Sequence, residues 1–300
     1  MNKKRAFTLV ELLVVIAIIA MLLAVLLPAM NKAKEKSRQV VCASQLGQCG
    51  VGFFSYAASN NGLIPPIRYV SWYDRPTPPT EGDTWDIHPS WSYMVFKVDF
   101  KKSGYDTLPF PKYLETEKDN NNSWGAGSLF LHMVIKDPKA FYCPSGTDIT
   151  HRYSSYAINH PWPWFYDDPG TTPIDKPNTR IGYNYVPQAK IGKDALGVPV
   201  LAKKAYQLDN ARIMSTDGLV SLANLAHRSG GRKGVNALFG DGRVDFRNEI
   251  IAFNPLLWEN PAFSNVPSGA GPKINNNPVL FRSVIRALEG DTKPVKAILR

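Results

Sequence analysis

The clearest pattern in the chain is a long run of hydrophobic residues close to the N-terminus. Sixteen consecutive apolar residues extend from Leu12 to Leu27, with neither a charge nor a glycine among them. The apolar stretch as a whole runs from Ala6 to Met30 and is interrupted only by Thr8, Glu11 and Pro28. A membrane-spanning helix needs about 20 predominantly apolar residues. The pattern therefore predicts a transmembrane helix at this end of the chain.

Three basic residues, Lys3, Lys4 and Arg5, stand directly before the apolar stretch. They predict a cytoplasmic N-terminus and an exported body, and no second apolar stretch of this length follows, so we expect a single pass. A signal peptide has the same two regions and is the plain alternative. Glu11 argues against that alternative, because a carboxylate costs about 2.5–3.5 kcal/mol at the bilayer centre and less near its edge. We therefore expect Glu11 to be functional and to need a partner.

The residues from Lys3 to Glu11 read KKRAFTLVE and resemble the processing motif of type IV prepilins and type II secretion pseudopilins. The resemblance implies that prepilin peptidase cuts between Ala6 and Phe7, and that the new amine of Phe7 is then methylated. The family usually has glycine before the cut, where this chain has Ala6. Pro28 falls where such helices commonly carry a proline.

The resemblance also implies how subunits assemble. Glu11 of one subunit meets the Phe7 amine of its neighbour, and this pairing removes the cost of two unpaired charges in an apolar environment. The implied partners are copies of the chain or other pilin-like subunits, prepilin peptidase and the inner-membrane assembly machinery. The implied location is the bacterial inner membrane, with an exported head and an extracytoplasmic filament after assembly.

The helix is expected to continue beyond the membrane to about Ser59, where Asn60-Asn61-Gly62 supplies a stop. Pro28 should kink or locally melt it, because proline removes one backbone hydrogen bond. Apolar positions suited to an amphipathic face continue at Val40, Val41, Leu46, Val51, Phe54 and Tyr56. Three glycines weaken the helix by up to about 1 kcal/mol each: Gly47, Gly50 and Gly52. The expected divisions are a leader at 1–6, a transmembrane or filament-core helix at 7–30, an amphipathic helix at 31–60 and an exported head at 61–300.

The head carries a different pattern, in which prolines and aromatic residues alternate, as in Trp72-Tyr73 followed by Pro78-Pro79. We expect long ordered loops there, whose aromatic side chains either pack locally or bind a glycan or another partner. The 24 prolines argue against an all-helical body. Strand-like residues flank Gly240-Asp241-Gly242, which predicts a β-hairpin.

Two further elements complete the expected fold. Residues 212–218 are predicted to form a strand that runs into a turn, and Pro278 to Leu288 a short helix or, in part, a strand. The fold class is therefore α+β: a long kinked N-terminal helix packed on a loop-rich globular head with a C-terminal antiparallel sheet.

Three further segments extend the resemblance to a large pilin-like group of planctomycete- and lentisphaerae-type bacteria. They are Cys42 to Leu46, Phe141 to Ser145, and His227 to Val244. Many members of that group carry a histidine, a short glycine-rich spacer and then Asp-Gly. The separation between His227 and Asp241 is longer here. The group's long helix, loop-rich middle and terminal sheet agree with the expected fold.

The three cysteines leave two disulfide pairings open. Cys42 and Cys49 are seven residues apart on one helix, about 10.5 Å between their Cα atoms, whereas bridged cysteines are usually about 4.4–6.8 Å apart. The exported location permits oxidation, and we hypothesise a Cys42–Cys143 bridge, with Cys49–Cys143 as the rival and three free thiols as the alternative. The chain has no Cys-x-x-Cys or paired-histidine spacing, so a zinc site is not expected.

Candidate catalytic and metal-binding residues are few. His227 and Asp241 are the most plausible polar pair of the hairpin, and a structural hydrogen bond is the favoured interpretation. Asp217 and Asp241 offer carboxylates to calcium, but calcium takes about six to eight oxygens and no such set is apparent. No nucleophile, phosphate-loop or dinucleotide motif is present. We therefore expect neither an enzymatic activity nor a cofactor.

The charge balance is basic, with 35 Lys and Arg against 25 Asp and Glu. Five basic residues lie around the predicted hairpin: Arg228, Arg232, Lys233, Arg243 and Arg247. Such a patch either binds DNA, an acidic polysaccharide or a membrane surface, or is a solvated basic face. Taken together, the sequence predicts a structural subunit of a type IV pilus-like or type II secretion pseudopilus filament. The alternatives are a pilin-anchored adhesin or glycan- or DNA-binding module, and a membrane-anchored exported enzyme.

Overall fold

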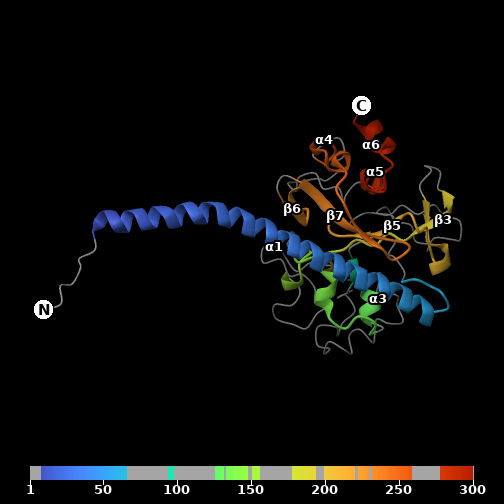
Figure 1. The fold of residues 1–300 in the computed structure, drawn as a ribbon. Coiled ribbons are helices and arrows are strands. Elements are labelled where there is room, and N and C mark those ends of the chain that lie inside the picture. Colours follow the sequence, from blue (N-terminus) through green and yellow to red (C-terminus); the bar gives the residue numbers. More distant parts are fainter. Residues whose placement is uncertain are drawn as a thin grey trace, which may run out of the picture.

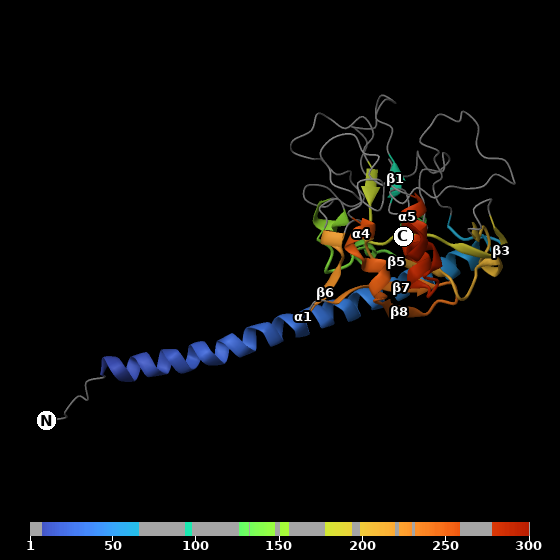
Figure 2. The same ribbon diagram turned by 90° about the horizontal axis from the view of Figure 1, so that it is seen from above.

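The structure is a computed structural model in which helix α1 (Leu9–Ser59) projects from a head of strands, short helices and loops (Figures 1 and 2). It describes residues 8–65, 94–97, 126–131, 133–147, 151–155, 178–193, 199–219, 222–229, 232–258 and 278–299. A long N-terminal helix followed by a head with a small antiparallel sheet is the α+β, pilin-like class that was expected. The proline- and tryptophan-rich segments 66–91 and 161–177 lie outside the described residues.

Helix α1 begins at a capping box that the sequence already spells out as Thr-x-x-Glu. The Thr8 hydroxyl accepts a hydrogen bond from the Glu11 backbone N–H at 3.2 Å, and the Glu11 carboxylate accepts one from the Thr8 backbone N–H at 2.8 Å. The helix ends at Ser59, as predicted. Beyond it, Gly62 adopts a φ of 78° and donates its N–H to the carbonyl of Ala57 at 2.8 Å.

Pro28 does not interrupt α1, which stays helical from Leu9 to Ser59. The expected local melting at Pro28 is therefore wrong, and Figure 1 shows a gently curved rod without a break. Proline removes a single N–H, and the helix-forming residues on both sides keep their own backbone hydrogen bonds. The loss of one bond therefore does not end this helix.

The two halves of α1 differ sharply in burial. Every side chain from Leu9 to Met30 is exposed. In the second half, the buried side chains recur every three or four residues, as one face of a helix requires. They are Gln39, Cys42, Leu46, Cys49, Phe53 and Ala57.

The predicted apolar face was therefore partly wrong. Val40, Val41 and Val51 are 60, 45 and 72% exposed. They do not fall at three- or four-residue spacing from Leu46, which is fully buried. Leu46, Phe53, the two cysteines and the small residues of α1, rather than its valines, face the head.

The main sheet is centred on strand β7 (Arg232–Phe239). Strand β8 (Val244–Arg247) pairs with one edge, and β5 (Ile213–Thr216) and β6 (His227–Ser229) follow one another along the other edge. All pairings are antiparallel. The predicted hairpin is confirmed as β7 and β8, and its turn uses a φ of 89° at Gly242. The predicted strand over residues 212–218 is confirmed as β5.

Two small antiparallel pairs and several short helices make up the rest of the described part of the head. Strand β1 (Met94–Lys97) pairs with β2 (Asn178–Arg180), and β3 (Gln188–Lys193) pairs with β4 (Pro199–Leu201). The remaining α-helices are α3 (Ala126–Leu131), α4 (Pro255–Trp258), α5 (Pro278–Leu288) and α6 (Lys293–Ile298). The 3-10 helices are η4 (Pro138–Phe141), η6 (Tyr153–Ser155), η7 (Ala205–Gln207), η8 (Leu222–Asn224) and η9 (Ile250–Phe253). The helix expected from Pro278 is confirmed as α5.

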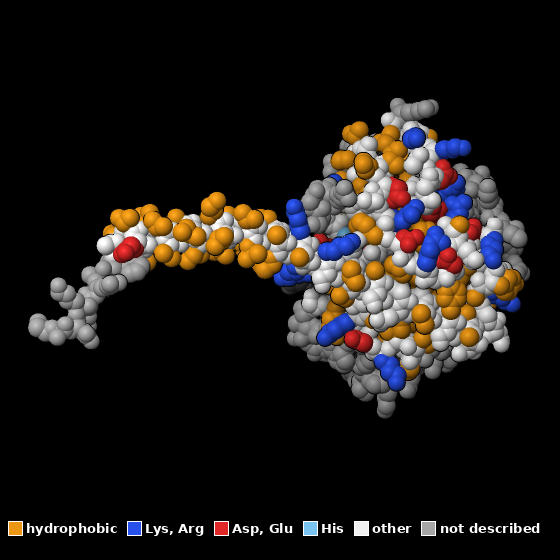
Figure 3. Space-filling view, in the orientation of Figure 1, with side chains coloured by type: hydrophobic (Ala, Val, Ile, Leu, Met, Phe, Trp, Pro, Cys, Tyr) orange, Lys and Arg blue, Asp and Glu red, His pale blue; other side chains and the backbone are white. Residues whose placement is uncertain are grey.

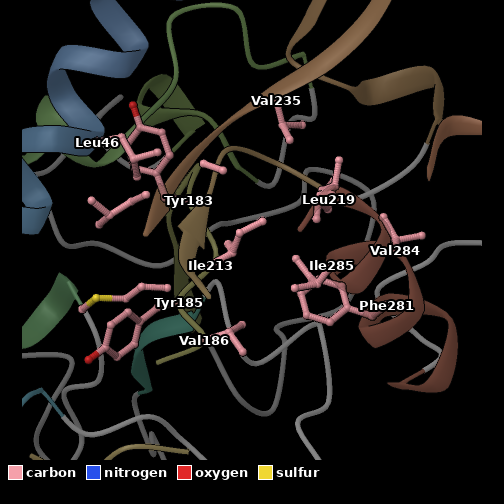
Figure 4. Close-up of a cluster of buried hydrophobic side chains, with 14 of the residues drawn as sticks. Leu46, Tyr183, Tyr185, Val186, Ile213, Leu219, Val235, Phe281, Val284 and Ile285 are labelled. Atoms are coloured by element: carbon pink, nitrogen blue, oxygen red, sulfur yellow. The ribbon is translucent and has the colours of Figure 1, made fainter. Parts of the chain in front are cut away.

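The hydrophobic core fills both faces of the main sheet. On one face of the sheet, Leu46 of α1 lies close to Tyr183. On the other face lie Phe281, Val284 and Ile285 of α5 (Figure 4). Both faces of β5 are buried as a result. The head is thus layered as helix, sheet and helix, and the second half of α1 is one of the layers.

The glycines of α1 allow this layer to lie close to the sheet. A Cβ atom on Gly50 would stand 2.8 Å from Leu238 Cδ1 of β7, and one on Gly52 would stand 3.0 Å from Leu129 Cδ1 and 3.1 Å from Ile135 Cδ1. Such distances are shorter than ordinary van der Waals contact. The helix propensity lost at these positions is therefore compensated by close packing against the head.

Candidate functional site

The first candidate site is the projecting half of α1. Between Leu9 and Met30 it carries one charged side chain, Glu11, and Figure 3 shows a rod covered in hydrophobic side chains with an acidic group near its far end. Both hydrogen bonds from Thr8 end on Oε2 of Glu11, at 2.8 Å each. Among the described residues, Oε1 of Glu11 takes no hydrogen bond. The predicted processing residues Ala6 and Phe7 lie outside the described part of the chain.

The second candidate site lies under the other half of α1, where polar side chains meet inside the core. We call Cys42, Cys143, Asp217 and His227 the buried cluster. One Sγ, Nε2 or carboxylate oxygen from each of the four lies within 4.8 Å of all the others. The four residues are between 0 and 7% exposed. Each comes from a different segment: α1, the loop after η4, the end of β5 and the start of β6.

Three distances define the interior of the buried cluster. Cys42 Sγ lies 3.4 Å from Asp217 Oδ2, and Cys143 Sγ lies 3.5 Å from His227 Nε2. His227 Nε2 and Asp217 Oδ2 are 3.1 Å apart. A Cβ atom on Gly182 would stand 2.9 Å from the backbone nitrogen of Cys143, so this glycine lets the Cys143 loop approach. The two sulfur atoms, the imidazole nitrogen and the carboxylate therefore point at a common centre.

Asp217 lies between the end of β5 and the start of β6, where it pairs with Asn236 of β7. Its backbone N–H donates to the carbonyl of Asn236 at 3.1 Å, and its Oδ2 accepts from the Asn236 backbone N–H at 2.9 Å. The carboxylate thus replaces a strand carbonyl at the point where β5 ends and β6 has not begun. The other carboxylate oxygen, Oδ1, is buried and has no hydrogen-bond partner among the described residues.

The imidazole of His227 is held from its outer side as well. Its Nδ1 lies 2.9 Å from Oε1 of Glu35 on α1, and the Ser145 hydroxyl donates to both Glu35 oxygens at 2.9 Å. The Asn236 side-chain nitrogen lies 3.1 Å from His227 Nε2 and donates to the Gln39 carbonyl at 3.2 Å. These contacts orient the ring so that Nε2 faces the two sulfur atoms.

With no metal ion bound, the surroundings of His227 raise its pKa, and a metal ion at Nε2 would replace the proton on that nitrogen. Burial lowers the pKa of His227, but hydrogen bonds to Asp217 and Cys42 and the charge of Asp217 more than offset this, so the pKa lies above its ordinary value. Burial also raises the pKa of the neighbouring Tyr183 hydroxyl well above its usual range. That hydroxyl lies 3.6 Å from Cys42 Sγ. The thiols of Cys42 and Cys143 and the Tyr183 hydroxyl are therefore all buried.

The structure separates His227 from Asp241, so the predicted polar pair is wrong. His227 stands opposite Gly234, whereas Asp241 follows Phe239 beyond the far end of β7. Five residues of strand span about 17 Å. Asp241 instead accepts hydrogen bonds from Arg243, at 3.1 Å from its backbone nitrogen and 2.7 Å from Nη1.

The structure also separates Asp217 and Asp241, the two carboxylates considered as calcium ligands. Asp217 lies beside Asn236 inside the sheet, and Asp241 lies in the half-exposed turn. No contact among the described residues joins the two carboxylates, so they do not share a site.

The cysteines are free thiols in this structure, so the predicted Cys42–Cys143 bridge is not formed in it. Their sulfur atoms nevertheless lie within 4.8 Å of each other. Cys49 points elsewhere, with Sγ 3.9 Å from the carbonyl of Ala140. The proposed partners therefore face one another, and the bond itself stays a prediction.

The predicted basic patch is partly neutralised. Arg243 lies 3.0 Å from Asp245 and stacks 3.9 Å above the Phe239 ring, and Arg247 lies 3.1 Å from Glu249. Arg228 is exposed and pairs across the strands with the half-buried Lys233. The side chain of Arg232 lies outside the described residues. The hairpin thus presents paired charges more than free cations.

Among the described helices, α1 alone is long and apolar enough to cross a membrane. Together with the motif reported next, it indicates a class of membrane-anchored proteins. Residues 1–27 match the family model described as the prokaryotic N-terminal methylation motif, the signature of type IV pilins and pseudopilins. The motif indicates a type IV pilin-like or pseudopilin-type protein. No curated protein and no solved structure matches the chain.

Proposed function

We propose that the chain is a structural subunit of a pilus-like or pseudopilus filament, cut by prepilin peptidase between Ala6 and Phe7 and methylated at Phe7. The observation that carries this proposal is the rod from Leu9 to Met30, which starts within the methylation motif and has every side chain exposed. Leaving a large apolar side chain in water costs about 1.5–3 kcal/mol relative to burying it. The rod therefore requires a bilayer before assembly and the helices of neighbouring subunits afterwards.

Glu11 is the residue through which we expect subunits to recognise one another. Thr8 donates both of its hydrogen bonds to Oε2 of Glu11, and we expect Oε1 to accept from the Phe7 amine of a neighbour. Burying the carboxylate and the amine among apolar helices costs free energy, and their attraction offsets this cost only when the two groups meet in good geometry. The pair therefore fixes the axial position of one subunit relative to the next. The assembly machinery of the inner membrane and other pilin-like subunits are the implied partners.

The test is to replace Glu11 and to count filaments in cells that carry the assembly machinery. Glu11→Ala and Glu11→Gln should abolish filaments while the protein stays in the membrane fraction, because the apolar rod is unchanged. Ser44→Ala, at an exposed position of the same helix, is the control and should assemble normally. Filaments at wild-type abundance from Glu11→Ala would refute the proposed role of Glu11.

A further inference from the structure

We propose that the buried cluster, Cys42, Cys143, Asp217 and His227, is a tetrahedral binding site for a divalent transition metal, with zinc as the favoured ion. The site would join α1 directly to three separate segments of the head. This inference is independent of the proposed filament function, since none of the four residues lies in the projecting half of α1 from Leu9 to Met30. It also departs from the expectation of no metal, which rested on the absence of ligands at short spacing.

The geometry agrees with the dimensions of a tetrahedral zinc site. With Zn–S of about 2.3 Å and Zn–N or Zn–O of about 2.0–2.2 Å, ligand atoms lie about 3.4–3.8 Å apart. The corresponding distances here are 3.4 Å from Cys42 Sγ to Asp217 Oδ2 and 3.5 Å from Cys143 Sγ to His227 Nε2. The third, from His227 Nε2 to Asp217 Oδ2, is 3.1 Å. The remaining pairs of ligand atoms lie within 4.8 Å of each other, so a metal ion fits between the four residues after shifts of up to about 1 Å.

The buried polar atoms provide an independent sign of a ligand. Asp217 is fully buried, and its Oδ1 has no hydrogen-bond partner among the described residues. Burying a carboxylate oxygen without a partner is costly. The proposed ion would bind Oδ2, which faces Cys42 and His227, and a cation on the same carboxylate would offset the cost of burying Oδ1. The donor set of two sulfurs, one nitrogen and one oxygen suits zinc, whereas calcium and magnesium take oxygen ligands.

The surroundings of His227 resemble the support that metal-bound histidines normally have. Such a histidine uses one ring nitrogen for the metal and gives the N–H of the other to a carboxylate or carbonyl group. Here Nε2 faces the cluster, and Nδ1 lies 2.9 Å from Glu35, which Ser145 holds in turn. The backbone N–H of Asn236 orients Asp217 in the same way. Glu35 is therefore a positioning residue for the proposed site.

A disulfide between Cys42 and Cys143 is the competing use of the same atoms. Forming it removes two electrons and two protons from the two thiols, and it leaves His227 and Asp217 as the only remaining ligands. Metal binding and the disulfide are therefore mutually exclusive states of this site. Cys49 provides a matched control, because it is also buried on α1 but directs its sulfur at Ala140.

The experiment measures metal bound to the full-length protein, purified in detergent under reducing conditions. After zinc is supplied and excess removed, elemental analysis should find about one zinc per chain. A titration with Co²⁺ should give the intense visible absorption of tetrahedral cobalt bound to thiolates. Cys49→Ala should retain both signals. Cys143→Ala should lose the absorption, and Glu35→Gln should weaken binding by about 10- to 100-fold while keeping a tetrahedral spectrum.

Two results would overturn the proposal. One is a wild-type protein that binds neither zinc nor cobalt while circular dichroism shows it folded. The other is a peptide crosslinked between Cys42 and Cys143 that persists in the protein isolated from cells with its thiols blocked at lysis. The wild-type cobalt spectrum needs no variant, so the test stands even if Cys143→Ala fails to fold.

Discussion

Replacing one glycine of α1 with alanine tests how closely the helix lies on the head. A Cβ atom at position 50 would stand 2.8 Å from Cδ1 and 3.3 Å from Cδ2 of Leu238, which is fully buried in the core. Gly50→Ala gains up to about 1 kcal/mol of helix propensity but overpacks the core at a cost of about 1–3 kcal/mol. At Gly47 the nearest atom is Val244 Cγ2 at 3.8 Å, an ordinary contact, so Gly47→Ala should keep the full gain.

The two alanine variants should therefore differ in stability by about 1–3 kcal/mol, with Gly47→Ala the more stable. The assay is urea unfolding of the full-length protein in detergent micelles, followed by tryptophan fluorescence, to which the buried Trp258 contributes. The midpoint of Gly47→Ala should rise, and that of Gly50→Ala should be unchanged or fall, at equal slopes. Equal upward shifts of both midpoints would refute the close approach of α1 to β7.

Two predictions concern the junction after α5. Glu289 is nearly buried and accepts hydrogen bonds from Arg212 at 2.6 Å and from the Ile213 backbone N–H at 2.9 Å, so Glu289→Ala should destabilise the head by about 1–3 kcal/mol in the same unfolding assay. Arg286 lowers the pKa of Asp291 by hydrogen bonding to its carboxylate. A lowered pKa gives stability that is present above the unfolded pKa of about 3.9 and is lost as the pH falls through the lower folded value. Asp291→Asn should therefore remove a small part of the acid dependence below about pH 4, and an unchanged acid limb would contradict this.

The long helix and the hairpin were predictable because their signals are local. An uninterrupted apolar run, the stop at Asn60 and the Asp-Gly turn each act within a few residues. The buried face of α1 was harder to predict, since the exposed valines are more hydrophobic than Gln39 and Ala57, which the head buries. Spacing from Leu46, rather than hydrophobicity, decides which side chains are buried.

The buried cluster could not be predicted from spacing. Cys42 and Asp217 are 175 residues apart, and Cys143 and His227 are 84 apart, so no short motif joins them. Metal motifs are recognised in sequences when the ligands lie on one turn or hairpin. Here the fold brings together single residues from four segments. The Asp-Gly after His227 suggested Asp241 as its partner, whereas the sheet places Asp217 there.

The most direct test of the filament account is the mass of the N-terminal peptide of the chain recovered from cells that contain prepilin peptidase. The account predicts a peptide that begins at Phe7, carries a methyl group on its amine and is present in sheared filaments. An uncleaved chain that keeps Lys3, Lys4 and Arg5 and remains dispersed in the membrane would contradict it.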